Sequence, residues 1–176
     1  MTDEDTVMPG PVTDPRAHAL RERYHELFEA EHLPVPVESI AEDMLGLSIR
    51  ESYELGCSGM LIPAAREIWV NAAEHERHGR PRFTLAHEVG HWICHWLEGR
   101  TQRPLYCRRE EVGPGEGRDL EREANVFAAE LLMPEPAVRA EFARRPDLAA
   151  RFAVSPQAMA WRLYNLGLGV APTLRR

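Results

Sequence analysis

The segment FTLAHEVGHWICHW, residues 83–96, decides how the rest of the chain is interpreted. It places three histidines, one glutamate, one cysteine and two tryptophans in fourteen positions. Wound as an α-helix of roughly four turns, it carries large apolar side chains along one side: Leu85, Val89, Trp92 and Trp96. His87 and His91, four residues apart, point together from another side. The segment is therefore either one wall of a metal site or an amphipathic helix that happens to be rich in histidine.

The pattern His-Glu-x-x-His at residues 87–91 favours the metal site. Two imidazoles one helical turn apart can both reach a single zinc ion at the usual Zn–N length of ~2.0–2.1 Å. Glu88 is one step round the helix from His87, where a base acting on a water molecule must lie. Gly90 costs about 1 kcal/mol relative to alanine in a helix interior, so we expect it to serve close packing beside the site. Short motifs also occur by chance, so this interpretation needs a third ligand.

A third ligand is available in LEREANVFAAELLMP, residues 120–134, which is strongly helical in pattern. Glu121 can complete a metal triad, while Asn125, four residues later, bonds the far nitrogen of a ligand histidine and fixes its tautomer. Glu123 is the competing ligand, but it lies about 200° round the helix from Glu121, so we favour Glu121. The role of His95 stays open between a contact behind the ligands, a proton donor to substrate and plain polar surface.

The flanking sequence predicts helices around a small sheet. Residues 1–15 are acidic and contain Pro and Gly, and we expect them to be disordered. A helix is predicted from Pro15 to about His32, followed by a turn, a short helix and a stop at Gly46. Three short, partly alternating runs predict an antiparallel sheet: residues 47–55, 58–63 and 66–72. Residues 99–118 form a long loop, and further helices are predicted after it: residues 119–133, 136–145, 147–154 and 155–168.

Composition and charge limit the classes of protein to which this chain can belong. A chain of 176 residues with 44% hydrophobic and 28% charged residues is typical of a soluble globular protein. The formal net charge of −7 argues against general affinity for nucleic acid or anionic membranes. The first residues lack the pattern of a secretion signal, and no apolar stretch approaches the ~18 residues of a membrane helix. Three widely spaced cysteines suit reduced thiols, so we expect a cytoplasmic protein with no membrane partner.

Two motifs taken together resemble the ImmA/IrrE family of metallopeptidases. They are RFTLAHEVGH at residues 82–91 and, about thirty residues later, EREANVFAAELLMP at residues 121–134. The upstream stretches SGMLIPAAREIWVNA and PVPVESIAEDMLGL also look like the N-terminal part of that family. The resemblance covers roughly residues 34–134, and the paired motifs with their spacing are specific to the family.

The resemblance implies both a fold and a set of site residues. The fold is α+β: a small antiparallel sheet packed on a mainly helical, zincin-like peptidase domain with a helical C-terminal extension. His87, His91 and Glu121 match the family's metal ligands, and Glu88 matches its catalytic glutamate. We accordingly divide the chain into a disordered tail, a zinc metallopeptidase core and a helix-turn-helix-like subdomain: residues 1–15, 16–134 and 135–176.

These residues predict a zinc-dependent endopeptidase, with manganese as the alternative ion. Three protein ligands leave one metal position for water, and Glu88 takes a proton from that water and delivers it to the leaving amine. Tyr53, Tyr106 and His95 are unranked candidates for a second contact to the oxyanion. The strand EIWVNA, residues 67–72, could hold an extended substrate at the edge of the sheet. The resemblance implies that the substrate is a cytoplasmic helix-turn-helix repressor, whose cleavage releases its genes.

The C-terminal residues leave a second class of function open. The stretch LAARFAVSPQAMAWRL, residues 148–163, has the sequence pattern of a helix-turn-helix with its turn at Val154–Ser155. Arginines outnumber acids around it. Such helix pairs also serve as packing units, so we expect docking of a protein substrate and no direct DNA binding. The alternative is a metal-containing binding or regulatory module that contacts DNA or a repressor without proteolysis. Structural zinc sites usually have four ligands rich in cysteine, which favours the enzyme.

Overall fold

The computed structural model describes residues 12–29, 33–74, 82–101, 105–106, 116–144 and 147–172, with the backbone alone at residues 105, 106 and 116. The α-helices are α1 Pro15–Phe28, α2 Val37–Ser39, α4 Arg82–His91, α5 Glu116–Leu132, α6 Glu135–Phe142, α7 Leu148–Phe152 and α8 Pro156–Asn165. The strands are β1 Ser48–Ser52, β2 Gly59–Ile62, β3 Glu67–Asn71 and β4 Leu105–Tyr106. The π-helical turns η1 Ile40–Met44 and η3 Trp92–Trp96 extend α2 and α4, and η2 Pro63–Ala65 is a 3-10 turn. The α+β class is confirmed.

The sheet is mixed, with the strand order β1-β3-β2-β4. β2 pairs antiparallel with both β3 and β4, whereas β1 pairs parallel with β3. The prediction of a wholly antiparallel sheet is therefore wrong for one pair of strands. After η2 the chain forms β3 between β1 and β2 rather than at the outer edge of the sheet, and in this position β3 runs parallel to β1. Ile68 and Val70 of β3 are buried, as befits the position of this strand inside the sheet.

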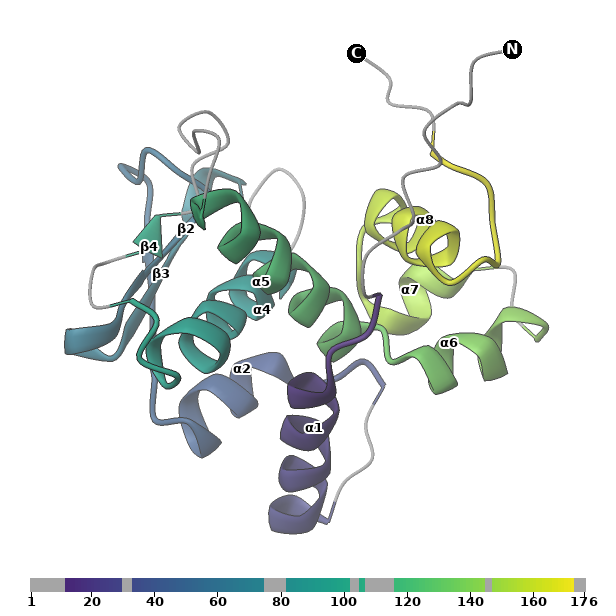
Figure 1. Ribbon diagram of the computed structural model, residues 1–176, viewed down its shortest axis with the longest axis horizontal. Coiled ribbons are helices and arrows are strands. Elements are labelled where there is room, and N and C mark those ends of the chain that lie inside the picture. Colours follow the sequence, from purple (N-terminus) through teal and green to yellow (C-terminus); the bar gives the residue numbers. More distant parts are fainter. Residues whose placement is uncertain are drawn as a thin grey trace.

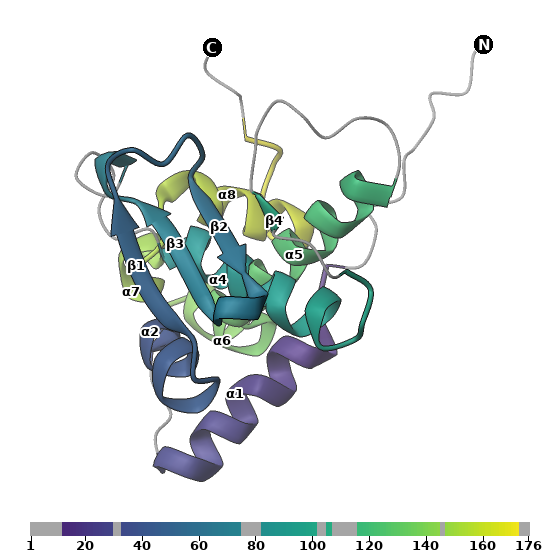
Figure 2. The same ribbon diagram turned by 90° about the vertical axis from the view of Figure 1, so that its left-hand side faces the viewer.

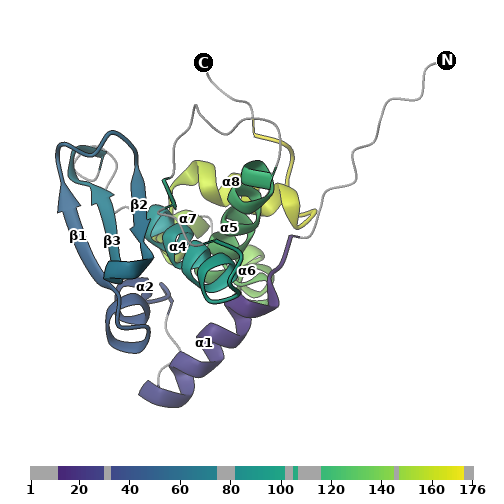
Figure 3. The ribbon, with the colours of Figure 1, turned by 60° about the vertical axis from the view of Figure 1, so that its left-hand side comes forward.

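The sheet lies against α4, and α4 in turn lies against α5. Figure 1 shows the sheet at one end of the molecule and α6, α7 and α8 at the other, with α4 and α5 between them. Figures 2 and 3 show that α4 lies behind one face of the sheet, with α5 and α8 beyond it. Among the described elements, α4 and α5 make the most extensive contact. Gly90 permits it, because a Cβ there would lie 3.1 Å from Phe127 and 3.2 Å from the backbone of Ala124. Its predicted role in close packing is confirmed.

The N-terminal helix is shorter than the sequence pattern predicts. α1 begins at Pro15. The Asp14 side chain caps it by accepting a hydrogen bond from the Arg16 backbone N–H. The helix ends at Phe28, whereas the apolar spacing predicts a helix to about His32. Glu29 adopts a left-handed conformation, with φ 50°, which stops the helix. Of the predicted disordered tail, residues 1–11 lie outside the described residues.

The C-terminal helices follow the predicted order. α7 and α8 lie within the predicted ranges, and α6 begins one residue before its predicted range, at Glu135. The turn between α7 and α8 falls at Val154–Ser155, as predicted. The Ser155 hydroxyl caps α8 by accepting a hydrogen bond from the Ala158 N–H at 3.1 Å.

A buried arginine joins this helical extension to the rest of the fold. Arg162 of α8 is 2% exposed and forms an ion pair with Glu130 of α5. Its Nε also donates to the Met133 carbonyl oxygen at 2.9 Å, and its Nη1 donates to the Val12 carbonyl oxygen. Arginines outnumber acids in this part of the sequence, but Arg162 adds nothing to a basic surface because it is part of the core.

Candidate metal centre

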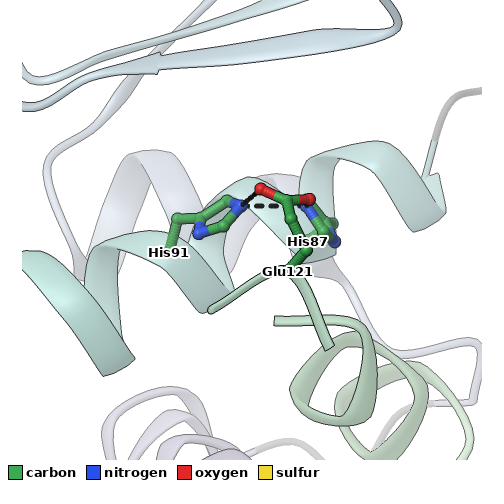
Figure 4. Close-up of side chains that lie close together, drawn as sticks. All are labelled: His87, His91 and Glu121. Atoms are coloured by element: carbon green, nitrogen blue, oxygen red, sulfur yellow. Dashed lines mark hydrogen bonds and ion pairs between the residues drawn. The ribbon is translucent and has the colours of Figure 1, made fainter. Parts of the chain in front are cut away.

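Two histidines of α4 and a glutamate of α5 converge between these helices. His87 and His91 are buried one helical turn apart, and their Nε2 atoms lie 2.9 Å from each other. The Glu121 carboxylate reaches both rings, with Oε2 3.1 Å from His87 Nε2 and Oε1 3.2 Å from His91 Nε2. Figure 4 shows the carboxylate directed at the two rings from the facing helix. The predicted triad is thus brought together, with one ligand atom from each residue within 4.8 Å of the others.

The far ring nitrogens of both histidines have partners, and these partners set the tautomers. His87 Nδ1 lies 3.0 Å from Asn125 Oδ1, which is the contact expected from the sequence. Because an amide oxygen only accepts, His87 carries its proton on Nδ1. His91 Nδ1 lies 2.8 Å from His95 Nδ1, and burial lowers the pKa of His91, so this ring is neutral. Neutral rings protonated at Nδ1 present their Nε2 lone pairs to Glu121.

Three electron-pair donors therefore face one another. The Glu121 carboxylate places one oxygen 3.1 Å from His87 Nε2 and the other 3.2 Å from His91 Nε2. Two nitrogen lone pairs and a carboxylate repel one another unless a cation lies among them. Two imidazole nitrogens and one carboxylate oxygen form the ligand set of many catalytic zinc sites. The residues present fit a divalent metal ion.

A second polar chain backs the ligand His91. His95 is fully buried, and its Nε2 lies 3.2 Å from Glu123 Oε2. Glu123 also accepts hydrogen bonds from Arg100 at 2.6 Å and from Arg16 at 2.7 Å. Burial raises the pKa of Glu123, but hydrogen bonds from Arg16, Arg100 and His95 outweigh burial and bring the pKa to about 2. Polar surface is therefore the wrong interpretation of His95, and Glu123 lies behind the ligands rather than among them.

Glu88 is a buried carboxylate without a hydrogen-bond partner among the described residues. It is 0% exposed, and burial raises its pKa to about 8, with the negative charge of Glu121 adding to the rise. β2 packs directly on it, because a Cβ at Gly59 would lie 2.8 Å from Glu88 Oε1 and 2.5 Å from Thr84 Cγ2. A buried polar group with no partner commonly marks a functional site. The sequence gives no signal for the role of Gly59.

The remaining sequence candidates for a contact to the oxyanion stay predictions. Tyr53 lies in the turn after β1 and is 67% exposed. The side chain of Tyr106 lies outside the described residues, although its backbone pairs with Met60 of β2. The predicted substrate edge at residues 67–72 is wrong, because β3 is paired on both sides, by β1 and by β2.

A groove of about 920 Å³ runs between α5 and α8 and reaches the candidate metal centre. Glu121 and Asn125 line it, and its apolar residues come from both helices and from α4. This groove could not be predicted from the sequence. Its two walls are helices that are separate in the sequence, and only the tertiary fold brings them together.

Comparisons with known proteins agree with this geometry. Residues 61–164 match the family model of the IrrE N-terminal-like domain, peptidase family M78, and the chain belongs to this family. Among solved structures, a Mycobacterium tuberculosis transcriptional regulator is similar in fold, with a TM-score of 0.59 and 20% identity. That match covers 84% of this chain and 46% of the regulator, so this chain spans less than half of the regulator's length. No curated protein matches the chain. Within the described residues, no helix is both long and apolar enough to cross a membrane.

Proposed function

We propose that this chain is a zinc-dependent endopeptidase that cuts a cytoplasmic helix-turn-helix repressor and so releases the repressed genes. One observation carries the chemistry: the His87, His91 and Glu121 ligand atoms converge beside Glu88, a buried carboxylate with no hydrogen-bond partner among the described residues. Membership of a peptidase family supports the reaction class. The repressor as substrate rests on the resemblance of the sequence motifs, and a transcriptional regulator of similar fold makes a transcriptional target the first to test.

The residues of this chain divide the work of peptide hydrolysis. A divalent ion held by His87, His91 and Glu121 supplies Lewis acidity for the scissile carbonyl and for water. Glu88 accepts a proton from the attacking water and returns it to the leaving amine. Its raised pKa, about 8, suits a group that exchanges a proton near neutral pH. Asn125 holds one ligand ring in the tautomer that leaves Nε2 free.

Zinc is the proposed ion, with manganese as the alternative. Two histidine ligands and one glutamate ligand, beside a second glutamate that acts as the general base, are a usual arrangement in catalytic zinc sites. Residues 16–134 form the proposed peptidase core, and residues 135–176 form a helical subdomain that helps to present the substrate. Exposed aromatic side chains on α8, Trp161 and Tyr164, support contact with a protein rather than with DNA.

The test is co-expression with a small helix-turn-helix protein encoded beside this chain's gene. We expect discrete fragments of that protein with the wild-type chain and an intact protein with Glu88→Gln. Gln keeps the shape of the side chain and removes the base, so the variant separates cleavage from binding. Salt-dependent, sequence-specific DNA binding with an intact repressor would instead establish the regulatory module without proteolysis.

A further inference from the structure

The groove between α5 and α8 carries two cations near the candidate metal centre. Arg118 and Arg122 of α5 line the groove and are exposed, and neither has an ion-pair or hydrogen-bond partner among the described residues. A third arginine in the lining, Arg162, is already paired with Glu130. Glu121 is the acid among the lining residues, and it faces the two histidines. The free charge of the groove is therefore positive and suits an acidic segment.

The lining of the groove combines polar residues with an apolar part. Five apolar side chains, which we call the apolar floor, contribute to it: Phe83, Val126, Ala129, Met133 and Ala158. Trp161 and Tyr164 of α8 stand along it, 37% and 43% exposed, with ring centroids 5.9 Å apart. Exposed aromatic side chains beside an apolar floor are typical of a surface that binds another segment of polypeptide.

The described chain begins at the far end of the same groove. Val12 lines the groove, and its carbonyl oxygen is bound by Arg162, which also binds the carbonyl oxygen of Met133. Met133 lies just past the end of α5, fifteen residues after Arg118. At 1.5 Å per residue, this separates the two ends of the groove by about 22 Å.

The eleven residues before Val12, MTDEDTVMPGP, match the groove in charge and in reach. They contain three acids and no base: Asp3, Glu4 and Asp5. Asp5 is seven residues from Val12, and an extended chain spans ~3.3 Å per residue, so Asp5 can reach about 23 Å from it. That reach is similar to the ~22 Å along α5 between Met133 and Arg118, and Arg122 lies about 6 Å nearer to Met133. Val7 and Met8 come between the acids and the tether and suit the apolar floor.

We propose that residues 1–11 of this chain bind along the groove, with their acids against Arg118 and Arg122. Bound in this way, the segment lies over the end of the groove that Glu121 and Asn125 line. The docking does not depend on the proposed peptidase function.

Zero-length cross-linking of the full chain tests the docking. The chain contains no lysine, so Arg118→Lys keeps the charge and adds a single side-chain amine. A carbodiimide joins that amine to carboxylates at ion-pair distance, and mass spectrometry of the digest identifies the joined peptides. Arg23→Lys is the matched control, because Arg23 is 64% exposed on α1, has Glu26 as a neighbouring carboxylate and lies within reach of the same tether. Arg122→Lys provides a second, independent measurement.

We expect cross-links within one molecule from the Arg118→Lys amine to Asp3, Glu4 or Asp5, at several times the yield of the control. The yield should fall several-fold in 1 M NaCl, where charges are screened over ~3 Å. A yield equal to that of Arg23→Lys, or one that salt does not change, overturns the proposal. So does a product that joins two molecules, because the groove would then hold a second copy. Cross-linking needs no catalysis, so a failure of the proposed peptidase function is recognised separately.

Discussion

The two histidines of the candidate metal centre are held in place by different surroundings. His87 is backed by Asn125, an exposed residue that lines the groove. His91 is backed by His95, which is fully buried and bound in turn to Glu123. The first support is a contact with an exposed side chain, and the second is a chain of hydrogen bonds that ends on a carboxylate held by two arginines.

The difference shows which side of the centre is fixed before any metal or substrate binds. Water can replace a lost partner on the exposed side, but it has no access to the buried His95. An orphaned buried donor costs about 1–3 kcal/mol, and the ligand ring is then free to turn. We infer that the His91 side fixes the geometry of the metal centre, while the His87 side faces the groove along which a substrate arrives.

Replacing the ligand common to both sides should have the largest effect. Glu121→Ala removes the carboxylate that contacts both Nε2 atoms, so we expect no bound metal after equilibration with a slight excess of zinc. Glu123→Ala is the control, because that carboxylate contacts His95 rather than the ligand atoms, and it should keep about one ion per chain. Elemental analysis of both proteins measures this. A full metal complement in Glu121→Ala would contradict the ligand assignment.

The base beside the centre should have the next largest effect. Glu88→Gln should keep the fold and the metal and should lower the cleavage rate roughly 10²–10⁴-fold, the usual range for a lost general base. Its buried carboxylate has no hydrogen-bond partner among the described residues to lose. Single-turnover cleavage and metal content are measured on the same preparation. Loss of metal in this variant would make Glu88 a ligand, and retained turnover would place the base elsewhere.

The buried support of His91 should matter by one to two orders of magnitude. His95→Phe keeps a ring of similar shape and removes the acceptor for His91 Nδ1, and Glu123→Gln removes the charge at the end of the chain. We expect both variants to bind zinc about 10–100-fold more weakly, as is usual when a partner behind a ligand histidine is lost. Competition with a chelator measures the affinity without any need for catalysis. Unchanged zinc affinity in both variants would show that burial alone fixes His91.

The parts of the centre that a helix repeat controls could be predicted from the sequence. His87 and His91, and likewise Glu121 and Asn125, lie four residues apart, and helical periodicity alone puts each pair on one face. Long-range arrangement could not be predicted. Arg16 reaches Glu123 across 107 positions of sequence, and neither residue has a pattern that indicates the other.

The sheet and the end of α4 show the same limit. Local alternation finds β1, β2 and β3 but not β4, which falls in the predicted loop at residues 99–118. The insertion of β3 between β1 and β2 depends on where η2 directs the chain. The π-helical turn η3 is also invisible in the apolar spacing, although it carries the buried His95. Local signals therefore predicted most of the elements and the three residues that meet at the candidate metal centre, and the tertiary fold decided which groups lie behind them.

Loss of the exposed support of His87 should have the smallest effect on zinc affinity. It also gives the most direct comparison with the buried support of His91. Asn125→Ala removes the acceptor for His87 Nδ1, but water can reach this exposed position and take its place. We expect zinc affinity to fall by less than about tenfold, below the range for the buried side. Asn125→Asp keeps an acceptor of similar shape and should stay close to the wild type. If Asn125→Ala weakens zinc binding as much as His95→Phe does, the two sides support the metal equally, and the inference that the His91 side fixes the centre is wrong.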